Sequence, residues 1–123
     1  MQPRGIRAGR GDAEDRSLLN RGFEVTWNPM RYVLICEDKP DSLALRLANR
    51  DDHLAFIRTH GDRVQLAGPM LSDDGENMVG SLFIIDAGSI EEVQAMNAAD
   101  PYTRADLFAR VTILPFRQVI PAP

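Results

Sequence analysis

The chain has a single cysteine, Cys36, among its 123 residues, so no disulfide can form within it and a reducing compartment is expected. It also lacks an apolar run approaching the roughly 18 residues that a membrane span needs. Its first residues contain no apolar stretch of the kind found in signal peptides. These absences predict a cytoplasmic protein that does not interact with membranes.

Positive charge is scarce as well. The sequence carries 14 Lys and Arg against 18 Asp and Glu, a net charge of −4. Because no basic stripe is available to neutralise phosphates, nucleic acid is not an expected partner.

Several catalytic motifs are missing. There is no glycine-rich phosphate loop after a strand and no G-x-S-x-G turn. The two histidines, His53 and His60, are seven residues apart, whereas a metal pair on a helix usually has i, i+4 spacing. We therefore expect no metal and no cofactor. Cys36 could act as a nucleophile, but a lone cysteine at the end of an apolar strand is more often a packing residue.

The length fits one domain. Residues 1–29 are rich in Gly, Arg, Asp and Glu and show little periodicity, so we interpret them as a poorly ordered N-terminal extension. Residues 30–120 form the predicted domain.

Within that domain, apolar runs alternate with helical periodicity. The capping-box pattern Ser89-Ile90-Glu91-Glu92 predicts a helix start, and Pro101 predicts a turn at Asp100. The expected elements are strands at 31–36, 64–68, 80–85 and 110–116, helices at 42–59 and 89–97, and a short helical turn within 102–108. The order strand, helix, strand, strand, helix, strand predicts a ferredoxin-like βαββαβ fold of the α+β class.

Residues 42–59 are expected to form one continuous helix. Leu43, Leu47 and Leu54 would make its core-facing stripe, with Arg46, Arg50 and His53 along one flank. Gly61 is expected to end this helix in a left-handed conformation. Gly68-Pro69 is expected to end the following strand.

The strands at 31–36 and 80–85 are apolar on both faces. Two helices cover only one face of a four-stranded sheet, which would leave a large apolar patch exposed. We therefore predict a homodimer that forms through the sheet.

His53 and Asp100 are the leading catalytic candidates. An imidazole exchanges protons near neutral pH, and a carboxylate can orient it by binding one ring nitrogen. The residues alone leave a second reading open, in which His53 bonds to nearby backbone and Asp100 only ends a helix.

The other candidates are substrate-binding residues. Arg46 and Arg50 could bind a carboxylate or enolate of a small anionic ligand, or equally pair with acids such as Asp38. Ser81 and Tyr102 could present hydroxyl groups to the same cleft, or serve as a turn residue and a packing residue. Gly68 and Pro69 would shape the backbone of the cleft.

The chain resembles the YciI-like family (the YCII-related domain), a branch of the dimeric α+β barrel proteins. The resemblance covers Met30 to about Ile120. The matching pieces occur in a consistent order: Tyr32-Val33, Glu37-Asp38, Asp41-Ser42-Leu43, Arg46, Arg50, His53, Leu66-Ala67-Gly68-Pro69, Gly80-Ser81, Asp100-Pro101-Tyr102 and Pro115-Phe116.

The resemblance implies a small dimeric protein with a His–Asp pair in a cleft, at His53 and Asp100. It favours lyase or hydrolase chemistry on a small anionic or aromatic metabolite. Some domains of this family are joined to other enzymes or to transcription regulators. A non-catalytic module that binds a small molecule or docks on a protein is therefore the alternative.

Overall fold

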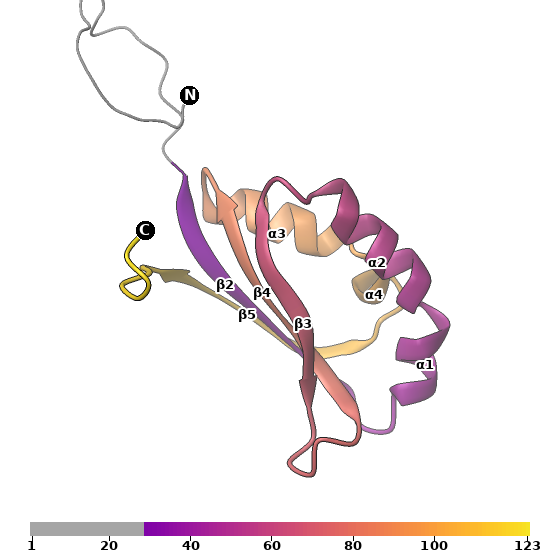
Figure 1. The fold of residues 1–123 in the computed structure, drawn as a ribbon. Coiled ribbons are helices and arrows are strands. Elements are labelled where there is room, and N and C mark those ends of the chain that lie inside the picture. The colour runs from indigo at the N-terminus through magenta and orange to yellow at the C-terminus, as the bar shows by residue number, and fades with distance from the viewer. Residues whose placement is uncertain (1–28) are drawn as a thin grey trace, which may run out of the picture.

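The computed structural model describes residues 29–123, which form a four-stranded antiparallel sheet with its helices on one side (Figure 1). The strand order in the sheet is β3-β4-β2-β5. The predicted extension, residues 1–29, lies outside the described residues apart from Pro29. The elements are β2 (Met30–Asp38), α1 (Leu43–Ala48), α2 (Arg50–Thr59), β3 (Val64–Leu71), β4 (Met78–Ala87), α3 (Ile90–Ala99), α4 (Pro101–Arg104) and β5 (Phe108–Phe116).

The core lies between the two central strands and the helices. In β2, every second residue is buried, and in β4 the same alternation buries Phe83 and Ile85. Val93 and Met96 of α3 pack against these side chains. The βαββαβ order and the α+β class are those predicted from the sequence, and the fold prediction is confirmed.

The first helix differs from its prediction, because it is broken at Asn49 into α1 and α2. The Asn49 side chain donates to the carbonyl of Leu45, and its backbone N–H bonds to the end of α1. The predicted leucine stripe is wrong for α1, where Leu43 is 36% and Leu47 is 53% exposed. Arg46 and His53 lie seven residues apart on either side of the break and are both buried, so the inward face lies along the predicted charged flank and not along the leucine stripe.

The buried residue of α1 is instead Arg46, and the buried residue of α2 is His53. Two of the three residues of the predicted charged flank, Arg46 and His53, therefore lie inside the fold, whereas the third, Arg50, is exposed. Buried polar side chains on these helices reverse the usual pattern, in which the buried face is apolar.

Two predicted boundaries were also wrong. β3 does not stop at Gly68-Pro69 but continues to Leu71, because β3 is an edge strand and tolerates a residue without a backbone N–H. Gly61 does not adopt a left-handed conformation; the C-cap of α2 is His60.

The predicted start of the second helix is confirmed. Ser89 caps α3 by accepting a hydrogen bond from the backbone N–H of Glu92, at 3.3 Å. The Glu92 carboxylate accepts from the N–H of Gly88 rather than from that of Ser89. Asp100 then leaves helical geometry, as Pro101 predicts, and starts α4.

No helix of the described residues covers the second side of the sheet (Figure 1). Val33 points to this side because its neighbours in β2 are buried on the other. Its cross-strand partners Ile84 and Leu114 share that face. Leu66 and Phe116 extend it, with exposed fractions of 61% and 43%. We call this surface the open face.

No helix within residues 29–123 combines the length and the apolar character needed to cross a bilayer.

Gly80 occupies a position in β4 where a larger residue does not fit. A Cβ atom there would lie 2.5 Å from the Cys36 carbonyl oxygen and 2.5 Å from Cε of Met70. We predict that Gly80→Ala lowers the free energy of unfolding by about 1–3 kcal/mol, since a backbone atom must shift. Urea unfolding followed by circular dichroism measures the change.

Gly68→Ala is the matched control, because nothing lies within 4 Å of a Cβ atom at that position of the neighbouring strand. Its stability should stay within about 1 kcal/mol of the parent. Equal losses in both variants would contradict the packing argument.

Candidate active site

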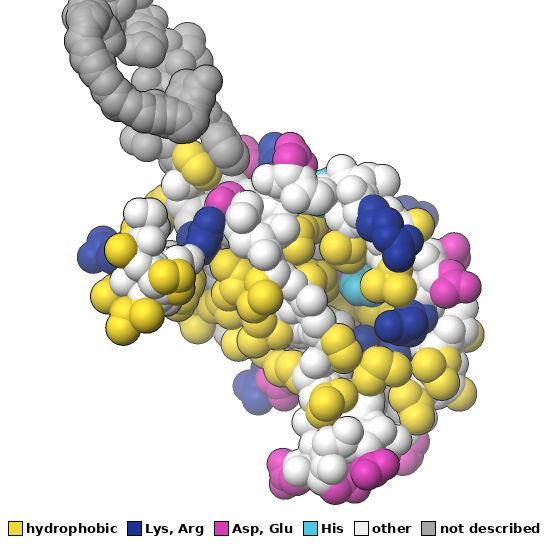
Figure 2. All heavy atoms as spheres, in the orientation of Figure 1, with side chains coloured by type: hydrophobic (Ala, Val, Ile, Leu, Met, Phe, Trp, Pro, Cys, Tyr) yellow, Lys and Arg dark blue, Asp and Glu magenta, His cyan; other side chains and the backbone are white. Residues whose placement is uncertain are grey.

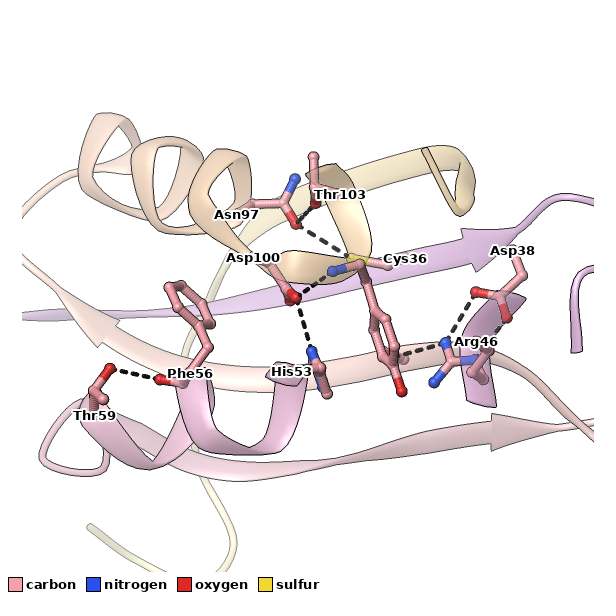
Figure 3. A network of polar contacts seen from close by, with 11 residues as sticks. Cys36, Asp38, Arg46, His53, Phe56, Thr59, Asn97, Asp100 and Thr103 are labelled. Atoms are coloured by element: carbon pink, nitrogen blue, oxygen red, sulfur yellow. Dashed lines mark hydrogen bonds and ion pairs between the residues drawn. The ribbon is translucent and has the colours of Figure 1, made fainter. Parts of the chain in front are cut away.

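His53 and Asp100 are hydrogen-bonded to each other in the space between α2 and the start of α4 (Figure 3). The distance from His53 Nδ1 to Asp100 Oδ1 is 2.8 Å, and both side chains are more than nine-tenths buried. An ionised carboxylate only accepts hydrogen bonds, so Nδ1 carries the proton that is donated. In the neutral imidazole, Nε2 is then left as the proton acceptor.

Asp100 holds more than the imidazole. The same Oδ1 atom accepts the backbone N–H of Tyr102 at 2.9 Å, as the N-cap of α4. Asp100 is 2% exposed, and Pro101 follows it at the first position of the helix. One carboxylate oxygen therefore fixes both His53 and the first turn of α4.

Tyr102 lies between His53 and Arg46. Its ring is stacked on the imidazole, with 3.9 Å between centroids and 14° between planes. The guanidinium carbon of Arg46 is 4.6 Å from the same ring centroid. Since the imidazole covers one face of the ring, the guanidinium lies over the other. Such stacked and cation–π contacts contribute about 0.5–1.5 kcal/mol each beyond burial.

Arg46 is held by a buried ion pair. Its Nε and Nη2 atoms donate to the two oxygens of Asp38, at 2.7 and 2.9 Å, and Nη2 also donates to Ser81 Oγ at 2.9 Å (Figure 3). Burial lowers the pKa of Arg46, but the hydrogen bonds and charge of Asp38 more than offset this, and the pKa is raised. Of the two roles considered for Arg46, the structure shows the ion pair with Asp38, and Ser81 is hydrogen-bonded to the same guanidinium.

The remaining predicted ligand residues, Arg50, Gly68 and Pro69, do not lie together. Arg50 is exposed at the first position of α2 and forms no ion pair within the described part of the chain. Pro69 stands opposite Ser81 in the ladder and so shares its face of the sheet, while Gly68 points to the open face. Figure 2 shows a histidine side chain in a hollow that hydrophobic and basic side chains border.

Cys36 is inert in this environment. Burial raises the pKa of the Cys36 thiol to about 12, and the thiol lies 3.7 Å from Oδ1 of Asn97. Because the thiolate is the nucleophilic form, the packing role that the sequence favours fits this site.

The sequence reading did not assign Asp38 to the site, although it considered Asp38 as a partner for an arginine. Asp38 is in phase with the buried residues Leu34 and Cys36 of β2, so the two-residue alternation of the strand directs its side chain toward the helices. That alternation was a signal in the sequence, but the predicted strand ended at Cys36 and left Asp38 in a loop. Among residues 29–123, no three His, Cys, Asp or Glu side chains are grouped so as to hold a metal ion.

Comparison with known proteins identifies relatives over most of the chain. The model of the YCII-related domain family matches residues 30–117. Protein YciI of Escherichia coli O6:H1 is 38% identical over 97 residues, covering 73% of this chain and 99% of that protein. An uncharacterized protein of Haemophilus influenzae is 34% identical over the same shares.

A solved structure is also similar. The 5-chloro-2-hydroxyhydroquinone dehydrochlorinase TftG of Burkholderia phenoliruptrix, in complex with 2,5-dihydroxybenzoquinone, has a TM-score of 0.68 and 32% identity. The match covers 73% of this chain and 96% of that one.

The buried Arg46–Asp38 pair makes a stability prediction. Arg46→Met leaves the Asp38 carboxylate, which is 5% exposed, without its cation. We expect a loss of about 3–5 kcal/mol in the free energy of unfolding, measured in urea. The double variant Asp38→Leu, Arg46→Met removes the stranded charge and should recover most of that loss.

Arg104→Met is the control, since Arg104 is exposed at the end of α4; its effect should stay within about 0.5 kcal/mol. A double variant as unstable as Arg46→Met would show that the stranded charge is not the cause.

Proposed function

Because the chain belongs to the YCII-related domain family, we propose that it is a small-molecule enzyme, a lyase or hydrolase, with His53 as its acid/base group. The observation that carries this proposal is the 2.8 Å hydrogen bond between His53 Nδ1 and Asp100 Oδ1. Asp100 is the orienting group, and the substrate is a small anionic or aromatic metabolite.

The geometry favours proton transfer at Nε2. Asp100 fixes the tautomer in which Nε2 is unprotonated, and it stabilises the imidazolium that forms when Nε2 takes a proton. Stacking on Tyr102 holds the ring plane, so the direction of Nε2 is also fixed. A buried base in a fixed orientation suits removal of a proton from carbon or oxygen.

The dehydrochlorinase relative favours the lyase reading. Its name describes loss of hydrogen chloride from a hydroxylated aromatic ring, and its structure contains a dihydroxybenzoquinone. Such an elimination requires a base for one proton and a departing group, without attack by water. This chain has a candidate base in His53, and one of its histidine side chains is bordered at the surface by basic and hydrophobic side chains (Figure 2).

We propose that the protein works as a homodimer whose two copies pack through their open faces. The open face carries large apolar side chains that are about half exposed, such as Leu114 at 51%. Apolar area of this kind stabilises a complex by roughly 25 cal/mol per Å² buried. The cytoplasmic location predicted from the sequence stays a prediction.

The catalytic proposal predicts that His53→Gln lowers turnover about 10²–10⁴-fold while the fold is kept. The assay is chloride release from 5-chloro-2-hydroxyhydroquinone, the compound named for the relative, and from a panel of related halogenated phenols. Asp100→Asn should also lower turnover, since it perturbs the tautomer.

His60→Gln is the matched control, because His60 caps the end of α2 and packs on Phe56 away from Asp100. Its turnover should equal that of the parent. Unchanged turnover in His53→Gln would refute the acid/base role and favour the non-catalytic binding module.

The dimer proposal predicts that Leu114→Arg yields monomers, since two charges would be buried at the interface. Leu47→Arg is the control: Leu47 is as exposed, at 53%, but lies on α1 in the helical layer, so the dimer should persist. Light scattering after size-exclusion chromatography gives the mass. A monomeric parent protein would refute the proposal.

A further inference from the structure

The hydroxyl group of Tyr102 has an unused hydrogen bond. Tyr102 is 1% exposed, and its hydroxyl oxygen accepts from the Arg46 guanidinium. Among residues 29–123, the hydroxyl donates its own proton in none of the side-chain hydrogen bonds of the site. A buried donor without an acceptor costs about 1–3 kcal/mol, so native proteins rarely leave one. Such a group beside His53 is most simply explained by an acceptor that arrives with a ligand.

The hydroxyl points the same way as Nε2 of His53. Asp100 Oδ1 holds both His53 Nδ1 and the backbone N–H of Tyr102, at 2.8 and 2.9 Å. Both side chains therefore start beside one carboxylate oxygen, and their rings run nearly parallel, 3.9 Å apart. Their far ends, Nε2 and the phenol oxygen, project together away from Asp100. A single ligand can meet both.

Two cations, Arg46 and Arg50, and one anion, Asp100, act on this hydroxyl. Burial raises the pKa of Tyr102, so the phenol stays protonated, although the cations of Arg46 and Arg50 act on it in the opposite sense. The charge of Arg46 is balanced by Asp38. Arg50 has no acidic partner among the described residues, so its charge is available to a ligand.

We propose that the Tyr102 hydroxyl and the Arg50 guanidinium form an oxyanion site beside His53, which takes the phenolate or enolate oxygen of the substrate. The substrate class is then narrower than a small anion: it is a phenol or an enolisable carbonyl compound, whose oxygen is conjugated to the reacting carbon. This inference rests on the proposed acid/base role of His53.

The step balances with these groups alone. Nε2 accepts a proton from the substrate carbon next to the carbonyl, and the electron pair of that C–H bond forms the enolate. The negative charge moves to the substrate oxygen, where the Tyr102 hydroxyl donates a hydrogen bond and Arg50 supplies positive charge. When the enolate collapses, a new C=C bond forms and the leaving group departs with its electron pair. The proton stays on His53.

Arg50 is exposed, and its charge is close enough to act on the phenol of Tyr102, which is itself buried. A ligand oxygen that accepts a hydrogen bond from Tyr102 would therefore also be attracted by the charge of Arg50.

The test is a binding titration with 4-nitrophenol, whose absorption spectrum distinguishes phenol from phenolate. The parent protein should bind the phenolate at least about tenfold more tightly than the phenol, which lowers the pH of half-ionisation of the bound ligand by about one unit. Tyr102→Phe keeps the stacked ring and should lose about tenfold or more in phenolate affinity. Arg50→Gln should lose affinity as well.

Arg117→Gln is the matched control, since it removes the same charge from an exposed residue beyond the end of β5 and should bind as the parent does. Equal phenolate affinity in Tyr102→Phe and the parent would refute the site. If Tyr102→Phe does not fold, the phenolate affinity of Arg50→Gln is the deciding measurement, because Arg50 is exposed and its substitution should not disturb the fold. Equal affinity in Arg50→Gln and the parent would then refute the site. Binding of neutral 4-nitrophenol in preference to its anion would also refute it.

The two proposals fail separately. Phenolate binding that depends on Tyr102, without turnover of any substrate, would keep the oxyanion site and refute the enzyme. Turnover that depends on His53, together with phenolate binding that is the same in Tyr102→Phe as in the parent, would keep the enzyme and refute the oxyanion site.

Discussion

One oxygen atom of Asp100 connects the parts of the proposed site. It accepts the imidazole N–H of His53 and the backbone N–H of Tyr102. Through the first bond it fixes α2 against the end of α3; through the second it starts α4. Because α4 has only four residues, it has little helical stability of its own and depends on this cap. Asp100 therefore orients His53 and also positions Tyr102, whose ring stacks on the imidazole.

The polar network around Asp100 is expensive to bury, and its arrangement suggests why it is retained. Arg46, His53, Ser81 and Asp100 are all buried. Apolar residues of similar volume would often stabilise such a core equally well or better. The network instead fixes side-chain directions: Asp38 holds Arg46, Arg46 covers Tyr102, and Tyr102 covers His53. A binding or catalytic site requires side chains in fixed directions. Buried charges that served only stability would contribute little compared with apolar residues.

The sequence predicted the order of the elements, and its family resemblance implied a pair of His53 and Asp100, but the leucine stripe predicted for the first helix was wrong for α1. The fold followed from apolar runs and caps, such as Ser89, whose signals are local. The break at Asn49 depends on a side chain bonding to the carbonyl of Leu45, a competition that periodicity does not reveal. The extension of β3 past Pro69 depended on its place at the sheet edge, which is a property of the assembled fold. Both the break at Asn49 and the end of β3 therefore depend on contacts that apolar periodicity does not encode.

The two faces of the central strands allow one sheet to serve two purposes. In β4, Ser81 and Phe83 point toward the helices and the site, while Leu82 and Ile84 point to the open face. A strand that reads as continuously apolar can therefore support a polar site on one face and carry an apolar surface on the other. Neighbouring residues belong to different surfaces, so substitutions on the open face can alter assembly without contacting His53. Separate control of assembly and chemistry follows from the two-residue period of the strand.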